Sequence, residues 1–266
     1  MNTVIIIPAR YASTRYPGKP LAMLKGAFGK KMTLIERSWR AAKEVKGAQR
    51  VIVATDDQRI RDEAQRFGAE VIMTSELCEN GTERCAEAAD KLRDEYDIVV
   101  NFQGDAPLTP PWFVDGLISA LKETSDFSVA TPVLRCDVEM VNDLLEDRRK
   151  FMVGGTTAVF SKDFSALYFS KEVIPFMSEH RLKSSEGFVY HHVGVYAYRK
   201  EILSRYVSWG SSNLEISEGL EQLRFMENNK KILCVEVEAK GRKFWELNNP
   251  EDISKLEDFM SKMGIN

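Results

Sequence analysis

Three cationic side chains stand in one short segment near the start of the sequence. Arg10, Arg15 and Lys19 lie within Pro8–Leu21, which reads PARYASTRYPGKPL and directly follows the β-branched run Val4–Ile7. In open α/β sheets, ligands bind in loops that leave the carboxyl ends of strands, and small residues let backbone N–H groups face an anion. Three converging cations suit a nucleoside triphosphate. A solvated basic loop, the alternative, fits one such side chain better than three.

The segment differs from the two common phosphate-binding loops. It is not a Walker A sequence, because no glycine stands five positions before Gly18 and because Pro20 replaces the serine or threonine. It also lacks the G-x-G-x-x-G pattern of a dinucleotide site. The residues therefore predict a triphosphate site of another kind.

A carboxylate follows a second predicted strand, Ile98–Phe102, in the sequence Gln103-Gly104-Asp105. Proteins commonly hold Mg²⁺ with one or two carboxylates, substrate phosphates and water, so Asp105 is the predicted metal ligand. Gly104 permits close approach of the backbone to a ligand. The alternative for Asp105 is a helix N-cap or a turn.

The elements that would position these residues alternate in the first half of the chain. Apolar runs typical of buried strands are separated by apolar residues at helical spacing, and Gly68 ends one helix. The expected strands are Val4–Ile7, Val51–Ala54, Val71–Met73 and Ile98–Phe102. This alternation predicts an α/β layered fold with a mainly parallel sheet.

The second half is richer in predicted strands. They are Val129–Val133, Ala158–Ser161, Ala166–Phe169, Val193–Tyr198 and Leu233–Val237. Helices are expected around Ser217–Glu227 and Pro250–Met260, with Asn249 as the N-cap of the last. The charged stretch Glu146–Thr157 is expected to be exposed or mobile. Without a linker or an internal repeat, residues 1–266 are expected to form one continuous fold.

Composition excludes several classes of protein. The chain has 266 residues, 44% hydrophobic and 29% charged, with a formal net charge of −3, which suits a globular protein and argues against a general nucleic-acid binder. Four dispersed cysteines without a C-x-x-C pair argue against structural zinc and disulfides. The first apolar run is too short for a signal sequence, and no run would span a bilayer. We expect a cytoplasmic protein.

The sequence resembles the 3-deoxy-manno-octulosonate cytidylyltransferases, or CMP-Kdo synthetases, over nearly its whole length. The resemblance is carried by Pro8–Leu21, Val51–Asp57, Met73–Ser75, Gly81–Arg84, Val100–Asp105, Ala166–Ser170, His192–Arg199, Arg205–Trp209 and Leu220–Arg224. It implies a Rossmann-like nucleotide-diphospho-sugar transferase fold, with helices on both faces of a mixed, mainly parallel sheet. It also implies a homodimer whose nucleotide-binding part covers roughly residues 1–125. A β-rich part for sugar binding and dimerisation, roughly 126–248, and a C-terminal helix at 250–263 would follow.

The resemblance implies transfer of CMP from CTP to an acidic 3-deoxy-ulosonic sugar, with Mg²⁺ as cofactor, for lipopolysaccharide or capsule synthesis. Arg10, Arg15, Lys19 and Asp105 would be the catalytic residues. Asp105 and Asn248 occupy the two metal positions. The substrate-binding residues would be Ser13, Ser75, Gly81, Thr82, Arg84, Gln103, Lys171, His192, Tyr196, Glu218 and Glu221. His180 and His191 are expected at the surface.

This chain departs from the family pattern mainly on the metal and sugar side. The segment usually written G-V-D-T-P-E-D reads ELNNPED at residues 246–252, so Asn248 replaces an aspartate and Glu246 stands two residues before it. Further departures are Ala106 for glutamate, Lys171 for arginine, Met177 for aspartate and extra residues at Met152–Thr157. Lysine lacks the forked geometry with which arginine binds a carboxylate.

These departures leave alternatives open for the function. The acceptor could be an amino-substituted Kdo, such as 8-amino-Kdo, or another ulosonic acid. A CTP-binding pseudo-enzyme is a further alternative, motivated by Asn248. A glycosyltransferase fits least, because its usual D-x-D metal motif is missing near Asp105.

Overall fold

The computed structural model describes residues 1–13, 15–92, 96–153, 155–178, 180–181, 188–242 and 245–266. Within these ranges ten strands form one sheet in the order β5-β4-β1-β6-β11-β7-β10-β8-β9, with β12 also paired to β7. The strands are β1 (Thr3–Ala9), β4 (Arg50–Thr55), β5 (Glu70–Met73), β6 (Ile98–Phe102), β7 (Val129–Arg135), β8 (Thr156–Phe160), β9 (Ala166–Ser170), β10 (Tyr190–His192), β11 (Val195–Arg199) and β12 (Ile232–Glu236). A separate hairpin consists of β2 (Met23–Lys25) and β3 (Lys31–Thr33).

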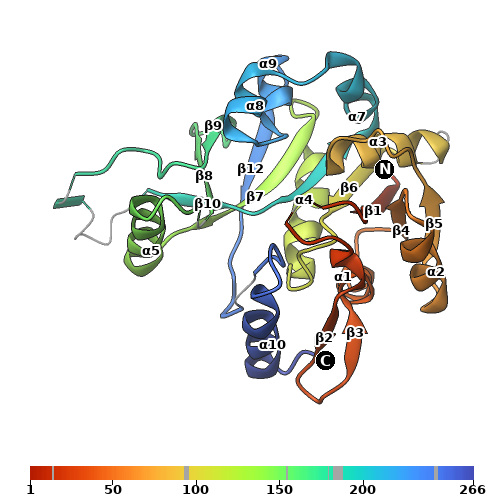
Figure 1. Ribbon diagram of the computed structural model, residues 1–266. Helices are drawn as coiled ribbons and strands as arrows, with labels where there is room; N and C mark the ends of the chain where they lie inside the picture. The colour runs from red at the N-terminus through yellow and green to blue at the C-terminus, as the bar shows by residue number, and fades with distance from the viewer. Residues whose placement is uncertain (14, 93–95, 154, 179, 182–187, 243–244) are drawn as a thin grey trace.

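Helices flank this sheet (Figure 1). They are α1 (Leu34–Lys43), α2 (Gln58–Arg66), α3 (Gly81–Lys91), α4 (Pro111–Glu123), α5 (Val138–Arg149), α7 (Lys200–Tyr206), α8 (Asn213–Glu218), α9 (Leu223–Glu227) and α10 (Asp252–Met263), with 3-10 turns η1 (Lys19–Leu21) and η2 (Val207–Trp209). In the part of the chain that is described, no helix is both long and apolar enough to cross a lipid bilayer.

Most strands of the sheet point in one direction. Strands β4, β1, β5 and β6 are joined by parallel pairs, whereas β11 runs antiparallel between β6 and β7. Strand β12 is parallel to β7, and β8 lies antiparallel to both β10 and β9. The expected mixed, mainly parallel sheet is therefore present. The carboxyl ends of β1 and β6 lie side by side, and these are the ends from which the two predicted site loops leave.

Alternate side chains of the buried strands enter two hydrophobic cores on opposite faces. Ile5 and Ile7 pack with residues of α1, α2 and α4, whereas Val4 and Ile6 pack with residues of α3, α7 and α9. This alternation follows from the two-residue period of a strand. Helices thus cover both faces, as expected.

A third apolar cluster joins the C-terminal helix to the β2–β3 hairpin. Its fully buried members are Leu24, Leu34, Leu247, Leu256 and Met260. Figure 1 shows α10 beside this hairpin at the lower end of the molecule. The cluster brings the segment just before α10 back to the edge of the sheet from which the β1 and β6 loops leave.

Several expected elements differ from the structure. The helix expected at Ser217–Glu227 is two short helices, α8 and α9, because Gly219 takes a left-handed conformation with φ of 62°. The expected N-cap Asn249 is also wrong: α10 begins two residues later with Glu251 as N-cap, and the Asn249 N–H donates to Asp252 instead. The strand expected at Val193–Tyr198 begins at Val195.

The stretch Glu146–Thr157 is only partly what was expected. Its beginning completes helix α5, and its end, Thr157, is a buried residue of β8. Phe151, Met152 and Val153 between them are exposed, and Gly154 lies outside the described residues. Together with β9 and β10, this region forms an arm that extends to one side of the body (Figure 1).

Candidate active site

The loop after β1 folds back on itself. The Gly18 N–H donates to the carbonyl of Tyr11 at 2.9 Å, and the Tyr16 N–H donates to Ser13 Oγ at 3.3 Å. Gly18 has a φ of 71°, and a Cβ there would lie 3.0 Å from the ring of Tyr11. Glycine is therefore required for this turn. The Thr14 of the sequence motif lies outside the described residues.

The predicted cations of this loop have different environments. Arg10 is exposed, and its guanidinium donates to the carbonyl of Glu79 at 3.3 Å. Arg15 is exposed as well. Lys19 is largely buried, and its ammonium forms an ion pair with Asp105, with 2.5 Å between Nζ and Oδ2. The structure therefore brings the predicted triphosphate loop and the predicted metal ligand into direct contact.

Close backbone packing fixes the Asp105 loop. A Cβ at Gly104 would lie 2.8 Å from the carbonyl oxygen of Pro8, so a larger residue would push the loops after β1 and β6 apart. The hydroxyl of Ser38 on α1 donates to the Gly104 carbonyl at 2.9 Å. The Leu247 N–H donates to the carbonyl of Asp105 at 2.9 Å. Three distant parts of the sequence thus meet at Asp105.

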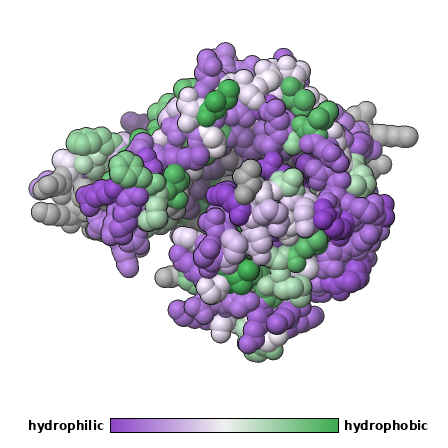
Figure 2. Space-filling view, viewed as in Figure 1, coloured by the Kyte–Doolittle hydropathy of each residue, from purple (hydrophilic) through white to green (hydrophobic). Residues whose placement is uncertain are grey.

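The C-terminal segment brings Glu246 and Asn248 to the same place. Burial and the charge of Asp105 raise the pKa of Glu246 to about 7, and a hydrogen bond with Asn248 opposes this increase. The cations of Lys19 and Arg15 also oppose it. The Glu246 residue as a whole is nevertheless exposed to solvent. Figure 2 shows the molecule hollowed near its centre, between the arm and the body.

The N-terminus of α3 lies beside the same loops. A Cβ at Gly81 would lie 3.4 Å from both Gln103 and Pro8. Glu221 accepts hydrogen bonds from the Thr82 N–H at 3.0 Å and from Gln103 Nε2 at 3.4 Å. Burial raises the pKa of Glu221, and the Thr82 hydrogen bonds oppose that increase. Gly81, Thr82, Gln103 and Glu221 therefore form one group.

Arg84 and Ser75 lie on the nucleotide side but make internal contacts. The Arg84 guanidinium is buried, pairs with Asp56 at 3.0 Å and donates to Thr74 Oγ1 at 2.6 Å. The Ser75 N–H donates to the Glu87 carboxylate, and its hydroxyl accepts from the Leu77 N–H. Arg84 thus joins the loops that follow β4 and β5. Its predicted contact with the nucleotide stays a prediction, as does that of Ser75.

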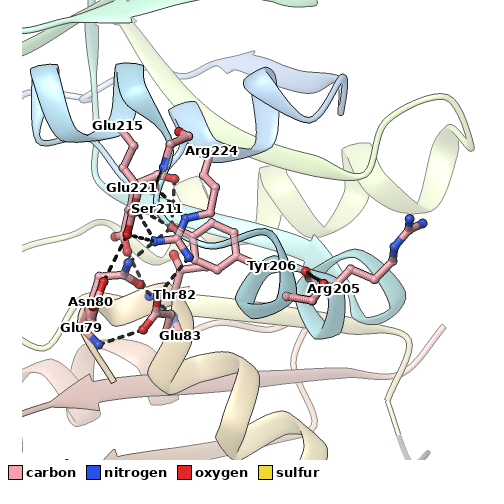
Figure 3. A network of polar contacts seen from close by, with 12 residues as sticks. Glu79, Asn80, Thr82, Glu83, Arg205, Tyr206, Ser211, Glu215, Glu221 and Arg224 are labelled. Atoms are coloured by element: carbon pink, nitrogen blue, oxygen red, sulfur yellow. Dashed lines mark hydrogen bonds and ion pairs between the residues drawn. The ribbon is translucent and has the colours of Figure 1, made fainter. Parts of the chain in front are cut away.

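A buried arginine that sequence reasoning missed fastens the two parts of the molecule together. Arg224 is fully buried and donates to both oxygens of Glu215, at 2.6 and 2.8 Å, and to Glu83 at 2.9 Å. Its guanidinium lies 4.0 Å from the ring centroid of Tyr206. Figure 3 shows how these residues of α3, α7, α8 and α9 converge. The network holds the first turn of α3, with Thr82, against Glu221.

Two predicted sugar-binding residues are buried. His192, with 6% of its surface exposed, lies with Nε2 2.9 Å from Thr131 Oγ1 and packs against Phe169. Burial lowers its pKa to about 3, which keeps the ring neutral. The Tyr196 hydroxyl donates to Gln222 Oε1 at 3.0 Å. Their roles stay predictions, and Gln222 is a neighbour that sequence reasoning missed.

Glu218 and Lys171 lie near the break between α8 and α9. The Glu218 carboxylate accepts from Ser170 Oγ at 2.7 Å and from the Lys171 N–H at 3.0 Å. The Lys171 ammonium approaches Gly219, where a Cβ would lie 2.8 Å from Nζ. These contacts join β9 to the turn at Gly219. No contact between these two residues and the group at Asp105 is found among the described residues.

His191 is half-buried rather than exposed as expected, whereas His180 is exposed. Burial lowers the pKa of His191 to about 4, and a Cβ on Gly155 would lie 2.7 Å from its Nε2. The alternation of a strand explains the error, because β10 is covered on both sides. Two adjacent histidines on it must face different parts of the interior.

Comparison with known proteins identifies the family. A profile described as cytidylyltransferase matches residues 4–232. A 3-deoxy-manno-octulosonate cytidylyltransferase of Maricaulis maris is 43% identical over 99% of both chains. The chain belongs to the cytidylyltransferase family. The mitochondrial 3-deoxy-manno-octulosonate cytidylyltransferase of Arabidopsis thaliana is 37% identical over 99% of this chain and 85% of its own.

Two solved structures are similar to this cytidylyltransferase. A structure of CMP:2-keto-3-deoxy-manno-octonic acid synthetase complexed with CTP has a TM-score of 0.83 and 32% identity, covering 99% of this chain and all of the other. A cytidylyltransferase from Leptospira borgpetersenii, 18% identical with a TM-score of 0.59, covers 97% of this chain and 85% of its own and shares the fold.

Proposed function

We propose that this cytidylyltransferase transfers CMP from CTP to Kdo, giving CMP-Kdo and pyrophosphate. The contact between Lys19 and Asp105 carries the proposal, because it puts a cation for phosphate next to a carboxylate for a metal. The relatives of known name support CTP and Kdo as the substrates. The anomeric hydroxyl of Kdo attacks the α-phosphorus, the bond to the bridging oxygen breaks, and the hydroxyl proton is released.

The cationic loop would act mainly by electrostatics. Arg10, Arg15 and Lys19 would bind the triphosphate, and their positive charge would stabilise the negative charge that moves onto the leaving pyrophosphate. Lys19 would exchange Asp105 for a phosphate oxygen when CTP binds. Two backbone constraints, at Gly18 and Gly104, hold the loop and the carboxylate before the substrate arrives.

The donor set at Asp105 fits Mg²⁺. Asp105, Glu246 and Asn248 offer only oxygen ligands, which Mg²⁺ prefers, and phosphates and water usually complete its octahedron. The described residues contain no group of three or more histidine, cysteine, aspartate or glutamate side chains that would hold a metal alone. We therefore expect the metal to need the phosphates of CTP as additional ligands. Bound there, Mg²⁺ would neutralise charge on the phosphate oxygens.

Orphaned polar atoms on the sugar side support a polar acceptor. Both amide atoms of Asn101 and the Nε2 of Gln222 are buried and have no hydrogen-bond partner among the described residues. Asn101 pairs with Tyr196 in the β6–β11 ladder, and Tyr196 contacts Gln222. Buried polar atoms left without partners are costly, so this region suits sugar hydroxyls or ordered water.

The arm supports the proposal of a homodimer. It exposes large apolar side chains, with Phe151 at 93%, Phe176 at 92% and Leu167 at 61% of their surface. Apolar patches of this kind commonly mark protein interfaces. Sedimentation equilibrium of the whole chain would give the mass of two chains, and a Phe151→Ser and Phe176→Ser double variant would shift it towards one.

Release of pyrophosphate from CTP in the presence of Kdo tests the function. We expect release with CTP and Mg²⁺, little with UTP, and a decrease of about a hundredfold or more in kcat/KM for Lys19→Ala. The matched control is Lys122→Ala, which replaces an exposed lysine on α4 and should leave kcat/KM unchanged. Other ulosonic acids, including 8-amino-Kdo, should be assayed in parallel. No release with any of them, from a folded protein that binds CTP, would overturn the proposal in favour of a pseudo-enzyme.

A further inference from the structure

The segment at residues 246–248 presents two polar side chains on one side. Leu247 is fully buried in the cluster that packs α10 against the hairpin, whereas Glu246 and Asn248 on either side of it are not buried. Because the buried Leu247 stands between them, Glu246 and Asn248 lie together on the more exposed side of this segment. Their side chains are joined by a hydrogen bond. The Leu247 N–H, bonded to the Asp105 carbonyl, fixes this segment relative to Asp105.

Asn248 is poorly suited to be the second metal ligand. Its amide oxygen carries no net charge, and affinity for a hard cation depends strongly on the number of charged ligands. Its backbone N–H donates to Asp252 at 3.0 Å, so the residue also belongs to the turn that begins α10. Glu246 supplies the charge that Asn248 lacks.

The position of Glu246 is unfavourable unless a cation joins it. The Asp105 carboxylate acts on Glu246 as a like charge, and in the absence of a ligand Asp105 is neutralised by Lys19. When Lys19 turns to a triphosphate, the two carboxylates lose this counter-ion, and Arg15 is the protein cation that still acts on Glu246. A divalent cation bound between them would remove this repulsion. Gly194 is a neighbour of this carboxylate, since a Cβ there would lie 3.5 Å from Glu246 Oε1.

We propose that Asp105 and Glu246 are the two carboxylates that bind the divalent cation accompanying CTP, with Asn248 orienting Glu246 through its hydrogen bond. The inference rests on the proposed function for the presence of the triphosphate, and it assigns the second charge of the site to a residue of this chain. The site then resembles other magnesium sites in having two carboxylates with the remaining positions left for phosphates and water.

Binding of Mn²⁺, a paramagnetic substitute for Mg²⁺, tests the inference without turnover. The Mn²⁺ affinity of the protein with CTP and no acceptor sugar is measured by water proton relaxation. Glu246→Gln, which keeps size and shape, should weaken binding by at least about tenfold. Asn248→Ala should weaken it by less than about threefold, because only the orientation of Glu246 is lost. Glu123→Gln, the same change at an exposed site on α4, should leave it unchanged.

Restoring charge at the neighbouring position provides the rescue. The double variant Glu246→Gln with Asn248→Asp should recover most of the lost Mn²⁺ affinity, and this separates a metal role from a defect in folding. Normal Mn²⁺ binding by Glu246→Gln, or a larger loss in Asn248→Ala, would overturn the inference.

The two proposals fail in different ways. If pyrophosphate is released with Kdo but Glu246→Gln binds Mn²⁺ normally, the function stands and the inference is wrong. If Mn²⁺ binding with CTP depends on Glu246 but no ulosonic acid supports release, the inference stands and the function is wrong.

Discussion

At the scale of single residues, two glycines differ in the space that is available for a Cβ atom. Gly104 meets the Pro8 carbonyl, whereas a Cβ on Gly116 in the middle of α4 would come no closer than 3.9 Å to Val235. The same substitution should therefore have opposite effects at the two positions. Only the first of them lies beside a predicted site residue, Asp105.

Gly104→Ala should destabilise the protein by about 1–3 kcal/mol, because the loops after β1 and β6 must separate to admit a methyl group. It should also reduce kcat by displacing Asp105. Gly116→Ala should stabilise the helix by about 1 kcal/mol, since alanine favours helix far more than glycine. Urea unfolding of both variants measures the difference. Equal stabilities would contradict the close approach at Pro8.

Among these substitutions, we expect replacement of Arg224 to lower the free energy of unfolding strongly. Arg224→Met leaves Glu215 and Glu83 buried without their cation and should destabilise the protein by about 3–5 kcal/mol. Arg205→Ala, an exposed arginine in the same view of the structure (Figure 3), should stay within about 0.5 kcal/mol of the wild type. Denaturant unfolding compares the two variants.

A second substitution in this network gives an independent check. Combining Arg224→Met with Glu215→Gln should cost less than the sum of the two single changes, because the orphaned charge is removed. Additive losses would mean that Arg224 and Glu215 do not stabilise one another.

At the scale of elements, the position of the segment before α10 depends on the packing of that helix. Leu256 of α10 and Leu247 are both fully buried in the same apolar cluster. The position of Glu246 therefore depends on how firmly α10 packs. This dependence can be measured apart from the chemistry of the site.

Leu256→Ala should destabilise the protein by about 2–5 kcal/mol through the cavity it leaves. Because the 246–248 segment loosens with α10, the variant should also bind Mn²⁺ more weakly in the presence of CTP, although every ligand is retained. The exposed Ser254 of the same helix is the control, and Ser254→Ala should change neither quantity appreciably. Unfolding and relaxation measurements together provide the test. A destabilised variant with normal metal affinity would separate α10 from the site.

The sequence predicted elements well where the signal was local. The buried β-branched run before Pro8 and the strand before Gln103 stand where expected, and so does the contact between the loops that follow them. Helix periodicity failed at Gly219, because apolar spacing continues across a break that only the backbone conformation reveals. Of the partners of Arg224, Glu83 is far away in the sequence and Glu215 lies on the preceding helix, and the apolar spacing used to predict these helices indicates neither pair.

At the scale of the whole molecule, buried histidines couple stability to pH. Burial lowers the pKa of His192 to about 3, so below the unfolded value of about 6.5 the unfolded chain binds a proton that the folded chain does not. The stability that neutral His192 contributes is complete above that value and is lost as the pH falls towards 3. His191 acts in the same direction.

Between about pH 7.5 and pH 5.5, each such histidine should lower the free energy of unfolding by about 1.4 kcal/mol. His192→Gln should reduce this dependence by that amount, whereas His180→Gln, at an exposed histidine, should leave it intact. Urea unfolding at the two pH values provides the measurement. An unchanged slope in His192→Gln would show that the pKa of this ring is the same in the folded and unfolded chains.

The bond from the Leu247 N–H to the Asp105 carbonyl also has a consequence for biosynthesis. Asp105 is synthesised before half of the chain has been made, but the segment that meets it follows only near the end. A growing chain could therefore fold the loop after β1 before the 246–248 segment that completes the proposed site has been made. Incomplete translation products, which lack that late segment, would be unable to consume nucleotide.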